Sequence, residues 1–458
     1  MIQRTLKQIS EMMKVQNASS AWNEIQITGV SIDSRKISKG NLFVPLKGEN
    51  ADGHKYVEDS IRKGAAAAFW QKDVPNPPLH LPILLVDDCL TALQELARQY
   101  RQQLSVKVVG ITGSNGKTTT KDMTASLLSI QYKVQKTEGN YNNHLGLPLT
   151  VLGLDEDTEM AVLEMGMSGR GEIEFLTKLA CPDAVVITNI GESHLLDLGS
   201  RDAIAEAKFE IMEGLKEGGL AVLHGDEPLL MDRMNRFKGN VQVKTFGRSE
   251  TNTLFPTEIH QLQYGNEFKI NASNRTFKLP VLGTHNILNA LAAMLVANYF
   301  SIPFERMDEK LSAIKLTNMR MELVEGKKGE KIINDAYNAS PTSMMAAIEL
   351  VSNLQGYAKK ILVLGDMLEL GPEETQYHLQ IGEELKTKKV DLLFTYGELG
   401  QSIAKGAEKV LDKEKIYAFT NKNELISELE KHVDNNTLVL VKASRGMKLE
   451  EIVTALQK

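Results

Sequence analysis

A mostly apolar run at residues 106–111 passes directly into a glycine-containing loop that ends in Gly116, Lys117 and Thr118. Such a run is typical of a central parallel strand that is covered by helices on both faces. The residues that follow, 118–129, predict a helix. Because parallel strands are joined by helical crossovers, this feature predicts an α/β fold built around a parallel sheet.

The loop between this strand and this helix has the residue types of a phosphate-binding site. It reads Gly-Ile-Thr-Gly-Ser-Asn-Gly-Lys-Thr-Thr-Thr from Gly110 to Thr120. Backbone N–H groups with a helix N-terminus behind them form an anion site, in which Lys117 would reach the β- and γ-phosphates and Thr118 would bind Mg²⁺. The standard pattern has glycine where this chain has Ile111, so we interpret the loop as a variant P-loop; the alternative is a plain turn of small residues. The predicted nucleotide contacts are Gly113, Ser114, Asn115, Gly116, Lys117, Thr118 and Thr119.

Length and composition restrict the class of protein. At about 100–200 residues per domain, the 458 residues predict two to four domains. A net charge of −6 provides no basic surface for nucleic acid or for an anionic membrane. The N-terminus lacks the apolar segment of a signal peptide, no run is long enough to span a membrane, and Cys89 and Cys181 are too few for a disulfide framework. We therefore expect a cytoplasmic protein without nucleic-acid partners or membrane insertion, acting as a monomer.

Changes in the pattern divide the chain into three α/β units at residues 1–103, 104–317 and 318–458. The first is small, the second contains the P-loop, and the third repeats the alternation of a Rossmann-like unit. Segment 250–280 alternates apolar and polar residues and predicts antiparallel strands, and a helix follows from His285. The other strands are expected at residues 25–30, 42–45, 83–86, 106–111, 160–164, 184–189, 220–223, 332–335, 361–365, 392–396 and 437–441.

Three residues beyond the P-loop are candidates for the same site. Glu164 ends a predicted neighbouring strand, where a P-loop Mg²⁺ needs a further oxygen ligand; the alternative is a solvated acid. His194 follows the next strand, so it is expected on the same side of the sheet, although a single histidine can also be structural. Lys208 lies on a predicted helix and by position alone reads as a solvated surface lysine.

Two further pairs suit a nucleotide. Asn286 and Asn289 stand at i and i+3 on one helix face, where their amides could read an adenine edge; the alternative is an N-cap and an incidental polar residue. Arg320 and Asp335 flank the start of the third unit. An arginine for phosphate and an aspartate for ribose hydroxyls would let a nucleotide bridge two domains.

These motifs, taken in order, resemble the Mur ligase family over nearly the whole chain. Segments 335–344 and 364–371 resemble the branch of that family that adds D-alanyl-D-alanine. Segments 33–36 and 42–54 resemble the uridine-nucleotide domain of the ligases that add the third and later residues. The Asp-(Asn/Asp)-Pro-Arg motif of the ligase for the third residue is absent from the sequence. The other residues that carry the resemblance are the P-loop, Glu164-Met-Gly, residues 188–194, Glu206-Ala-Lys208 and residues 283–290.

The resemblance implies roles that residue type alone does not assign. Lys208 aligns with a lysine that is carbamylated in related ligases and then helps to hold a second Mg²⁺, and Glu164 and His194 align with magnesium ligands. The implied catalytic residues are Lys117, His194 and Lys208. The implied contacts to the muramoyl-peptide nucleotide are Ser34, Arg35, Asn140, Asn143 and His144. Those to the incoming dipeptide are Tyr337 and Asn338, with segment 442–445 as a further contributor.

The implied activity is ATP- and Mg²⁺-dependent amide ligation of D-alanyl-D-alanine to UDP-N-acetylmuramoyl-tripeptide through an acyl phosphate. Residues 1–103 would bind the UDP-sugar, residues 104–317 ATP, and residues 318–458 the incoming dipeptide. One alternative is another ligase of the superfamily, such as a folylpolyglutamate synthase-like enzyme. A second is a P-loop regulatory protein that binds nucleotide without ligase chemistry.

Overall fold

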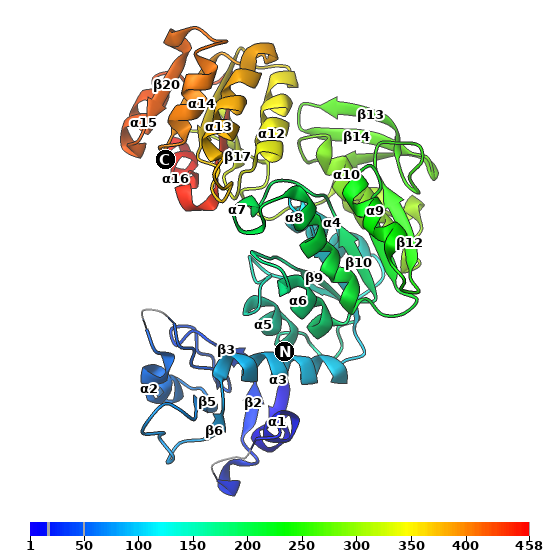
Figure 1. Cartoon of the computed structure of the whole chain (residues 1–458), viewed down its shortest axis with the longest axis vertical. Helices are drawn as coiled ribbons and strands as arrows, with labels where there is room; N and C mark the ends of the chain where they lie inside the picture. The colour runs from blue at the N-terminus through cyan, green and yellow to red at the C-terminus, as the bar shows by residue number, and fades with distance from the viewer. Residues whose placement is uncertain (16–18, 49–50, 458) are drawn as a thin grey trace.

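The structure, a computed structural model, describes residues 1–15, 19–48 and 51–457. It confirms the expected three-domain α/β architecture, with N-terminal, central and C-terminal domains following one another along the long axis (Figure 1). Each domain contains a sheet whose strands are all or mainly parallel. Within the described ranges, no helix combines the length and the apolar character that a membrane crossing requires.

The N-terminal domain has two sheets. Its elements are β1 (Gln3–Thr5), α1 (Leu6–Met13), β2 (Gln26–Thr28), β3 (Val30–Ser31), β4 (Leu42–Phe43), α2 (Val57–Arg62), β5 (Ala67–Gln71), β6 (Ile83–Val86) and α3 (Cys89–Gln103). The parallel sheet has the order β3-β4-β5-β6, and β1 pairs with β2 in an antiparallel ribbon. The single strand expected at residues 25–30 was wrong, because Gly29 at φ +76 breaks it into β2 and β3, which belong to different sheets.

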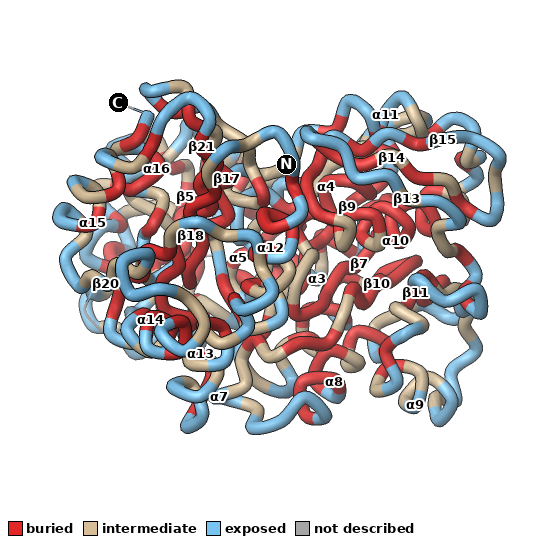
Figure 2. Tube along the Cα trace, turned by 90° about the horizontal axis from the view of Figure 1, so that it is seen from above, coloured by how far each residue is buried: buried red, intermediate tan, exposed pale blue. Residues whose placement is uncertain are grey.

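The central domain is built on a six-stranded parallel sheet. Its strands are β7 (Lys107–Thr112), β8 (Val134–Lys136), β9 (Met160–Glu164), β10 (Ala184–Ile187), β11 (Leu220–His224) and β12 (Gln242–Phe246). The order is β12-β11-β10-β7-β9-β8, so β7 lies between β9 and β10. The segments that follow these three strands therefore meet at one edge of the sheet. Apart from Lys107 at the start of β7, strands β7, β9 and β10 are buried in the middle of the domain (Figure 2).

Helices cover this sheet, and a small antiparallel sheet follows it. The helices are α4 (Lys117–Leu128), α5 (Gly146–Leu152), α6 (Glu172–Ala180), α7 (Leu195–Leu198), α8 (Arg201–Phe209), α9 (Pro228–Arg236), α10 (His285–Tyr299) and α11 (Asp308–Ser312). The antiparallel strands, as expected within residues 250–280, are β13 (Pro256–Leu262), β14 (Gly265–Ile270) and β15 (Ser273–Leu279). Helix α10 is apolar on nearly all sides and packs against α4 through residues such as Leu291 and Met123. This packing brings the start of α10 beside the P-loop.

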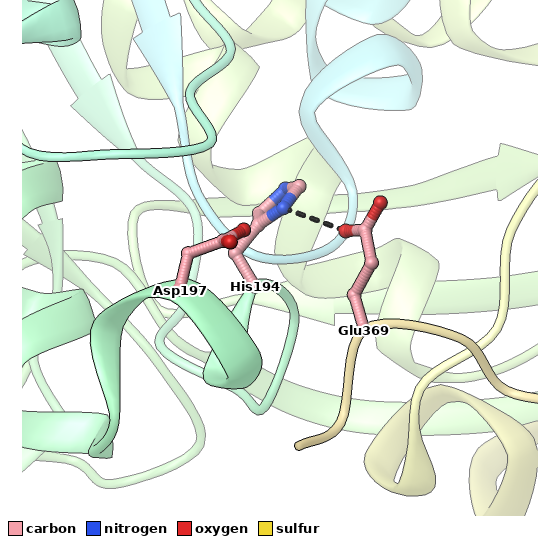
Figure 3. Close-up of side chains that lie close together, drawn as sticks. All are labelled: His194, Asp197 and Glu369. Atoms are coloured by element: carbon pink, nitrogen blue, oxygen red, sulfur yellow. Dashed lines mark ion pairs between the residues drawn. The ribbon is translucent and has the colours of Figure 1, made fainter.

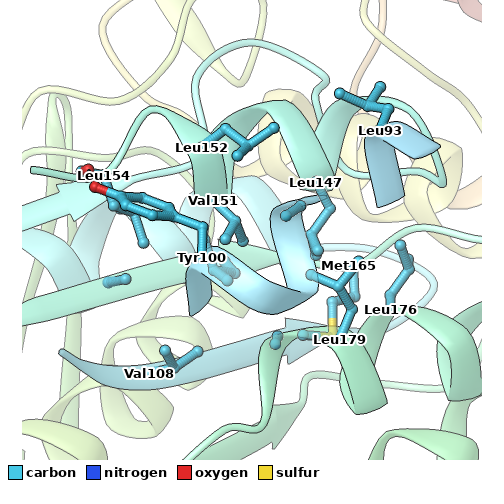
Figure 4. Close-up of a cluster of buried hydrophobic side chains, with 14 of the residues drawn as sticks. Leu93, Tyr100, Val108, Leu147, Val151, Leu152, Leu154, Met165, Leu176 and Leu179 are labelled. Atoms are coloured by element: carbon cyan, nitrogen blue, oxygen red, sulfur yellow. Dashed lines mark hydrogen bonds between the residues drawn. The ribbon is translucent and has the colours of Figure 1, made fainter. Parts of the chain in front are cut away.

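Helix α3 ties the N-terminal domain to the central domain through a shared apolar core. Leu93 and Tyr100 of α3 pack among side chains that include Val151 of α5 and Leu176 of α6 (Figure 4). All four are fully buried. The Tyr100 hydroxyl, which enters this core, donates to the Leu154 carbonyl at 2.8 Å and so keeps a hydrogen bond. The domain boundary expected at residue 103 remains a prediction.

The C-terminal domain is a second doubly covered sheet. Its strands are β16 (Glu322–Glu325), β17 (Lys331–Asp335), β18 (Lys359–Gly365), β19 (Leu392–Tyr396), β20 (Ile416–Phe419) and β21 (Thr437–Lys442), and its helices are α12 (Pro341–Asn353), α13 (Glu374–Glu383), α14 (Gly400–Ala407), α15 (Lys422–Leu429) and α16 (Glu450–Gln457). The order is β16-β17-β21-β18-β19-β20, and only β16 among these strands is antiparallel to its neighbour. Apolar clusters fill both faces. Asp335 at the end of β17 and Lys442 at the end of β21 line a cavity together with residues of the central domain.

Candidate active site

The loop between β7 and α4 is held by the end of β10. The Ser114 N–H donates to the Asn189 carbonyl at 3.0 Å, and the Asn115 N–H donates to Asn189 Oδ1 at 2.9 Å. Gly113 and Gly116 have φ values of +147° and +78°, which L side chains rarely adopt. The loop therefore has a fixed shape that depends on its glycines.

Replacing Gly113 with alanine is expected to lower the free energy of unfolding by about 2–4 kcal/mol, from overpacking and backbone strain. A Cβ at this position would lie 1.8 Å from Thr188 Oγ1. Urea denaturation measures the change, with Gly139→Ala as a matched control. Gly139 also has a positive φ, +54°, but among the described residues no atom lies within 4 Å of its Cβ position, so only about 1 kcal/mol is expected. Equal losses for the two variants would contradict the steric explanation.

Lys117, the first residue of α4, turns back over the loop. Its Nζ donates to the carbonyl of Gly113 at 2.8 Å and to that of Ser114 at 3.4 Å. Burial lowers the pKa of Lys117 below its usual value; the charge of Glu164 opposes this shift and that of Arg320 adds to it. Because both partners are neutral carbonyls, Lys117 remains available to an anion that enters the loop.

Thr118 at the start of α4 and Glu164 at the end of β9 form a buried oxygen pair. Thr118 Oγ1 donates to Glu164 Oε2 at 2.9 Å, and Arg320 Nη2 donates to Thr118 Oγ1 at 3.3 Å. Asn142 Nδ2 donates to the other carboxylate oxygen, Oε1, at 2.8 Å. Asn142 was missed from the sequence, because its neighbours in the same polar segment are equally plausible and no periodicity distinguishes them.

His194 and Lys208 approach the same place from the segment after β10. Burial lowers the pKa of His194 to about 4, and the charges of Lys117 and Lys208 act in the same direction. The imidazole is therefore neutral at neutral pH, the form that can bind a metal. Lys208, on α8, is 1 % exposed, and burial followed by the charge of Lys117 lowers its pKa well below the usual value. The interpretation from helix position alone, a solvated lysine, was wrong because α8 turns this face into the domain.

The charges around the loop are not balanced by the protein. Within the described residues, Glu164 has the neutral partners Thr118 and Asn142, and no carboxylate pairs with Lys117 or Lys208. Buried unpaired charges are unfavourable. This arrangement fits ligands of opposite charge, namely phosphates beside the lysines and a divalent cation beside Glu164. The oxygens of Thr118 and Glu164 are donors that Mg²⁺ prefers.

A cavity of about 190 Å³ lies between the central and C-terminal domains. Asn115 and Gly116 of the loop and Asn286 and Asn289 of α10 line its central-domain side. Asn289 Nδ2 donates to Asn286 Oδ1 at 2.9 Å, and Asn286 Nδ2 donates to the Leu282 carbonyl at 2.7 Å. The two amides thus orient one another on the cavity wall. Their contact with adenine remains a prediction.

The C-terminal domain supplies the opposite wall. Arg320, Asp335 and Asn338 line the cavity, together with Lys442. The guanidinium carbon of Arg320 lies 3.9 Å from the centroid of the Tyr337 ring. Lys442 Nζ donates to the Asp335 carboxylate and, at 3.0 Å, to the Asn338 carbonyl. Tyr337 therefore positions Arg320, while Lys442 orients Asp335.

His285, which was missed from the sequence, also lines this cavity. Burial lowers its pKa to about 4, so the ring is neutral at neutral pH. Its Nε2 lies 3.2 Å from Asn286 Nδ2. The sequence offered one signal for His285, namely its position directly before the predicted adenine contact Asn286. We interpreted His285 only as the first residue of a helix.

A second cavity, of about 650 Å³, lies between the N-terminal and central domains. Ser34, Arg35 and His144 line it. Two hydrogen bonds of 2.9 Å from the Arg35 guanidinium to the Asp33 carboxylate lower the pKa of Asp33 to about 2. The structure brings these three predicted residues together, although they come from two domains.

Two other predicted substrate contacts, Asn140 and Asn143, do not line the second cavity. Asn143 Oδ1 accepts the N–H of Gly146 at 2.9 Å at the start of α5, and Asn140 is exposed outside the lining of the second cavity. Residues 49–50 of the segment 42–54 lie outside the described residues. The geometry alone therefore gives these two asparagines no ligand.

Three family models match the chain in the order of its domains. The model described as "Mur ligase family, catalytic domain" matches residues 26–101. "Mur ligase middle domain" matches residues 111–297, and "Mur ligase, glutamate ligase domain" matches residues 319–445. Together they span most of the sequence.

Relatives and solved structures agree with this result over the full length. The UDP-N-acetylmuramoyl-tripeptide–D-alanyl-D-alanine ligase of Bacillus subtilis is 52% identical over 453 residues, which cover 99% of this chain and 98% of that protein. MurF from Acinetobacter baumannii superimposes with a TM-score of 0.90 at 30% identity, covering 100% of this chain and 99% of that one. MurF from Thermotoga maritima in complex with ADP has a TM-score of 0.83 at 30% identity, covering 94% and 97%. The chain belongs to the Mur ligase family.

Proposed function

We propose that the chain is an ATP-dependent ligase that joins D-alanyl-D-alanine to UDP-N-acetylmuramoyl-tripeptide and so forms UDP-MurNAc-pentapeptide for peptidoglycan synthesis. The name of the Bacillus subtilis relative, 52% identical over 99% of this chain, supports the choice of substrates. One structural observation carries the ligase chemistry. Two buried or partly buried lysines and a buried glutamate, without neutralising partners, surround a P-loop beside a cavity between two domains.

The reaction requires activation of a carboxylate, which by itself is a poor electrophile. The terminal carboxylate of the tripeptide attacks the γ-phosphorus of ATP, which forms an acyl phosphate and releases ADP. The uncharged dipeptide amine then attacks the acyl carbon, and the tetrahedral intermediate loses phosphate and one proton from the nitrogen. Such phosphoryl transfer depends mainly on positioning and charge stabilisation, which Lys117 and the loop N–H groups provide.

Thr118, Glu164, His194 and Lys208 would hold Mg²⁺. When bound, the ion neutralises charge on the phosphate oxygens. Thr118 at the start of α4 and Glu164 at the end of β9 hold their oxygens 2.9 Å apart, and His194 offers a neutral nitrogen. Burial lowers the pKa of Lys208 and so favours the uncharged amine, the form that adds to CO₂, with loss of a proton, to give an anionic carbamate.

The nucleotide is bound by the loop residues Gly113–Thr119 and by Asn286, Asn289, Arg320 and Asp335. All four residues outside the loop line the same interdomain cavity as Asn115, Gly116 and Thr119 of the loop, which supports this assignment. Arg320 would contact the phosphates, because it donates to Thr118 beside the loop, and Asp335, whose carboxylate accepts from Lys442, would bind the ribose hydroxyls.

Each of the three predicted units binds a different substrate. Residues 1–103 bind the UDP-sugar through Ser34 and Arg35, and residues 104–317 bind ATP. His144 lines the cavity that these two units share, which supports a muramoyl-peptide path from one to the other. Residues 318–458 receive D-alanyl-D-alanine near Tyr337 and Asn338, and the remaining muramoyl-peptide contacts are Asn140 and Asn143.

We further propose that the protein acts as a monomer in the cytoplasm, without nucleic-acid partners. The free thiols of Cys89 and Cys181 support a reducing compartment. Analytical ultracentrifugation of the purified chain tests the monomer, and a stable dimer would contradict it.

Phosphate release is expected only when ATP, Mg²⁺, UDP-MurNAc-tripeptide and D-alanyl-D-alanine are all present, because the acyl phosphate is consumed by the dipeptide amine. A coupled phosphate assay measures this with the lysine and the diaminopimelate forms of the tripeptide. Glutamate or single D-alanine in place of the dipeptide is the control.

Two results would contradict the proposal. Release that depends on glutamate would favour a folylpolyglutamate synthase-like ligase. ATP binding without any substrate-stimulated release would favour a regulatory P-loop protein.

A further inference from the structure

The linker between α11 and β16, residues 313–321, is bonded to the central domain through Asp122. Asp122 lies on α4, one helical turn beyond Thr118, and its side chain is 1 % exposed. Its Oδ2 accepts the Thr317 N–H at 2.9 Å and the Thr317 hydroxyl at 2.8 Å. No role has been assigned so far to Asp122 or to Thr317.

Two lysines hold Asp122 in its charged form. Lys136 Nζ donates to Asp122 Oδ1 at 2.6 Å, and Lys121 Nζ lies 3.5 Å from the same oxygen. Burial acts to raise the pKa of Asp122, but the charge of Lys121 and the hydrogen bond from Lys136 outweigh it, so the pKa lies below its usual value. Hydrogen bonds to a charged acceptor are stronger than those between neutral groups. Asp122 therefore binds Thr317 firmly.

The linker beyond Thr317 has an uncommon backbone conformation. Met319 and Met321 have φ values of +61° and +52°, which residues other than glycine seldom adopt. The Met319 N–H donates to Glu322 Oε2 at 2.9 Å, and the Met321 N–H donates to Asp335 Oδ1 at 3.2 Å. Such a conformation persists only where surrounding contacts maintain it. The linker is thus held by the central domain at Thr317 and by the C-terminal domain at Met321.

Arg320 lies between these two points of contact and lines the nucleotide cavity. Its Nη2 donates to Thr118 Oγ1 at 3.3 Å, whereas its buried Nε has no hydrogen-bond partner among the described residues. A buried N–H group without a partner is unfavourable, so this guanidinium suits an anionic ligand. Arg320 follows Thr317 by only three residues. The position of Thr317 therefore limits where the guanidinium can lie.

A second contact between the two domains lies away from the linker. Glu369 Oε2, in the segment after β18, lies 2.9 Å from His194 Nδ1, in the segment before α7 (Figure 3). The Leu196 N–H donates to the Glu369 carbonyl at 2.9 Å, and Thr342 Oγ1 donates to Glu192 Oε2 at 2.7 Å. A change at Thr317 should therefore alter the position of Arg320 while the domains stay in contact.

We propose that Asp122 and Thr317 are positioning residues for the ligase reaction, which hold the linker so that Arg320 reaches the phosphates of the nucleotide. The inference rests on the proposed function, which assigns Arg320 to the nucleotide. Helix α4 then contributes to the phosphate site in two ways. Its first turn supplies Lys117 and Thr118, and its next turn holds the segment that carries Arg320.

Thr317→Val tests the contact, because valine keeps the shape of threonine and removes only the hydroxyl. Asp122→Asn is less suitable, since it also takes the charged partner from Lys121 and Lys136. We expect kcat/KM for ATP to fall about 10-fold, the effect of losing one hydrogen bond to a charged group, and the KM for the tripeptide to stay within about twofold. Thr317→Ser keeps the hydroxyl and should behave as the wild type. The matched control is Thr257→Val, at an exposed threonine of the same domain.

A double-mutant cycle with Arg320→Ala separates positioning from a general structural effect. If Thr317 acts by holding Arg320, the loss caused by Thr317→Val should shrink to less than about twofold in the Arg320→Ala background. A loss of about 10-fold that persists in this background means that Thr317 acts independently of Arg320, and it overturns the proposal.

Hydrogen exchange of the whole protein measures the linker without turnover. Peptides that cover residues 317–323 should exchange faster in Thr317→Val, because the N–H groups of Met319 and Met321 lose their fixed partners, whereas peptides from α4 and β8 should not change. Unchanged exchange in the linker, or faster exchange with an unchanged kcat/KM for ATP, overturns this inference alone. Absence of dipeptide-dependent phosphate release in the wild type overturns the proposed function, and the exchange measurement then still decides whether Thr317 holds the linker.

Discussion

Lys117→Ala is expected to lower kcat for dipeptide-dependent phosphate release by at least about 10³-fold, as is typical when a cation that stabilises phosphoryl transfer is removed. The side chain is bonded to the carbonyls of Gly113 and Ser114, so it is already positioned over the loop before any phosphate arrives. Burial also strengthens its interaction with an anion, because the local dielectric is low. Alanine removes the charge but does not change the loop backbone, so the hydrogen bonds that the loop donates to the segment after β10 are kept.

The measurement is single-turnover ADP formation, which reports the phosphoryl-transfer step directly. Lys238→Ala, at an exposed lysine of the same domain, is the control and should behave as the wild type. An unchanged thermal unfolding midpoint for Lys117→Ala would exclude loss of the fold. Near-normal ADP formation in this variant would contradict the assignment of the P-loop.

Lys208→Arg is expected to lower kcat by about 10²- to 10³-fold, although it keeps a long basic side chain at the same position. Arginine remains protonated and cannot add CO₂, whereas the lowered pKa of Lys208 keeps its amine available. The variant therefore lacks the carbamate and places a fixed cation beside Lys117 and the metal. Both changes act against the phosphoryl-transfer step.

The carbamate can be observed directly by ¹³C NMR of the protein equilibrated with ¹³C-bicarbonate. A carbamate signal is expected in the wild type and should be absent from Lys208→Arg. The matched control is Lys121→Arg, at a lysine that is equally buried but donates to the Thr137 carbonyl at 2.8 Å and lies 3.5 Å from Asp122. The signal should remain in that variant, and full activity of Lys208→Arg would contradict a role for the carbamate.

Local motifs carried most of the correct predictions. The strand, loop and helix around Gly113 and Lys117 could be predicted because a parallel strand and a phosphate-binding turn each need a short, specific pattern. Glu164 could be placed in the same site because adjacent parallel strands end at the same edge of a sheet. The break at Gly29 could not be predicted, because the strand-like pattern continues through this residue. Only its backbone angle shows that the chain passes from one sheet to another.

Helix faces were harder to predict. Lys208 was read as exposed because a lysine on a helix usually lies at the surface, and the sequence does not show which side of α8 faces the domain. Asn142 was missed for a similar reason, since only the folded loop turns its amide toward Glu164. In both cases the orientation follows from packing against elements that are distant in the sequence.

By itself, the sequence determined the α/β class, the variant P-loop and the family, because these depend on short patterns and on their order. The tertiary structure decided which groups share a site. Asn286 and Asp335 line one cavity, and His194 meets Glu369, because the C-terminal domain lies against the carboxyl edge of the central sheet. No local pattern encodes such contacts, since they depend on the order of the strands and on how two separately folded domains pack together.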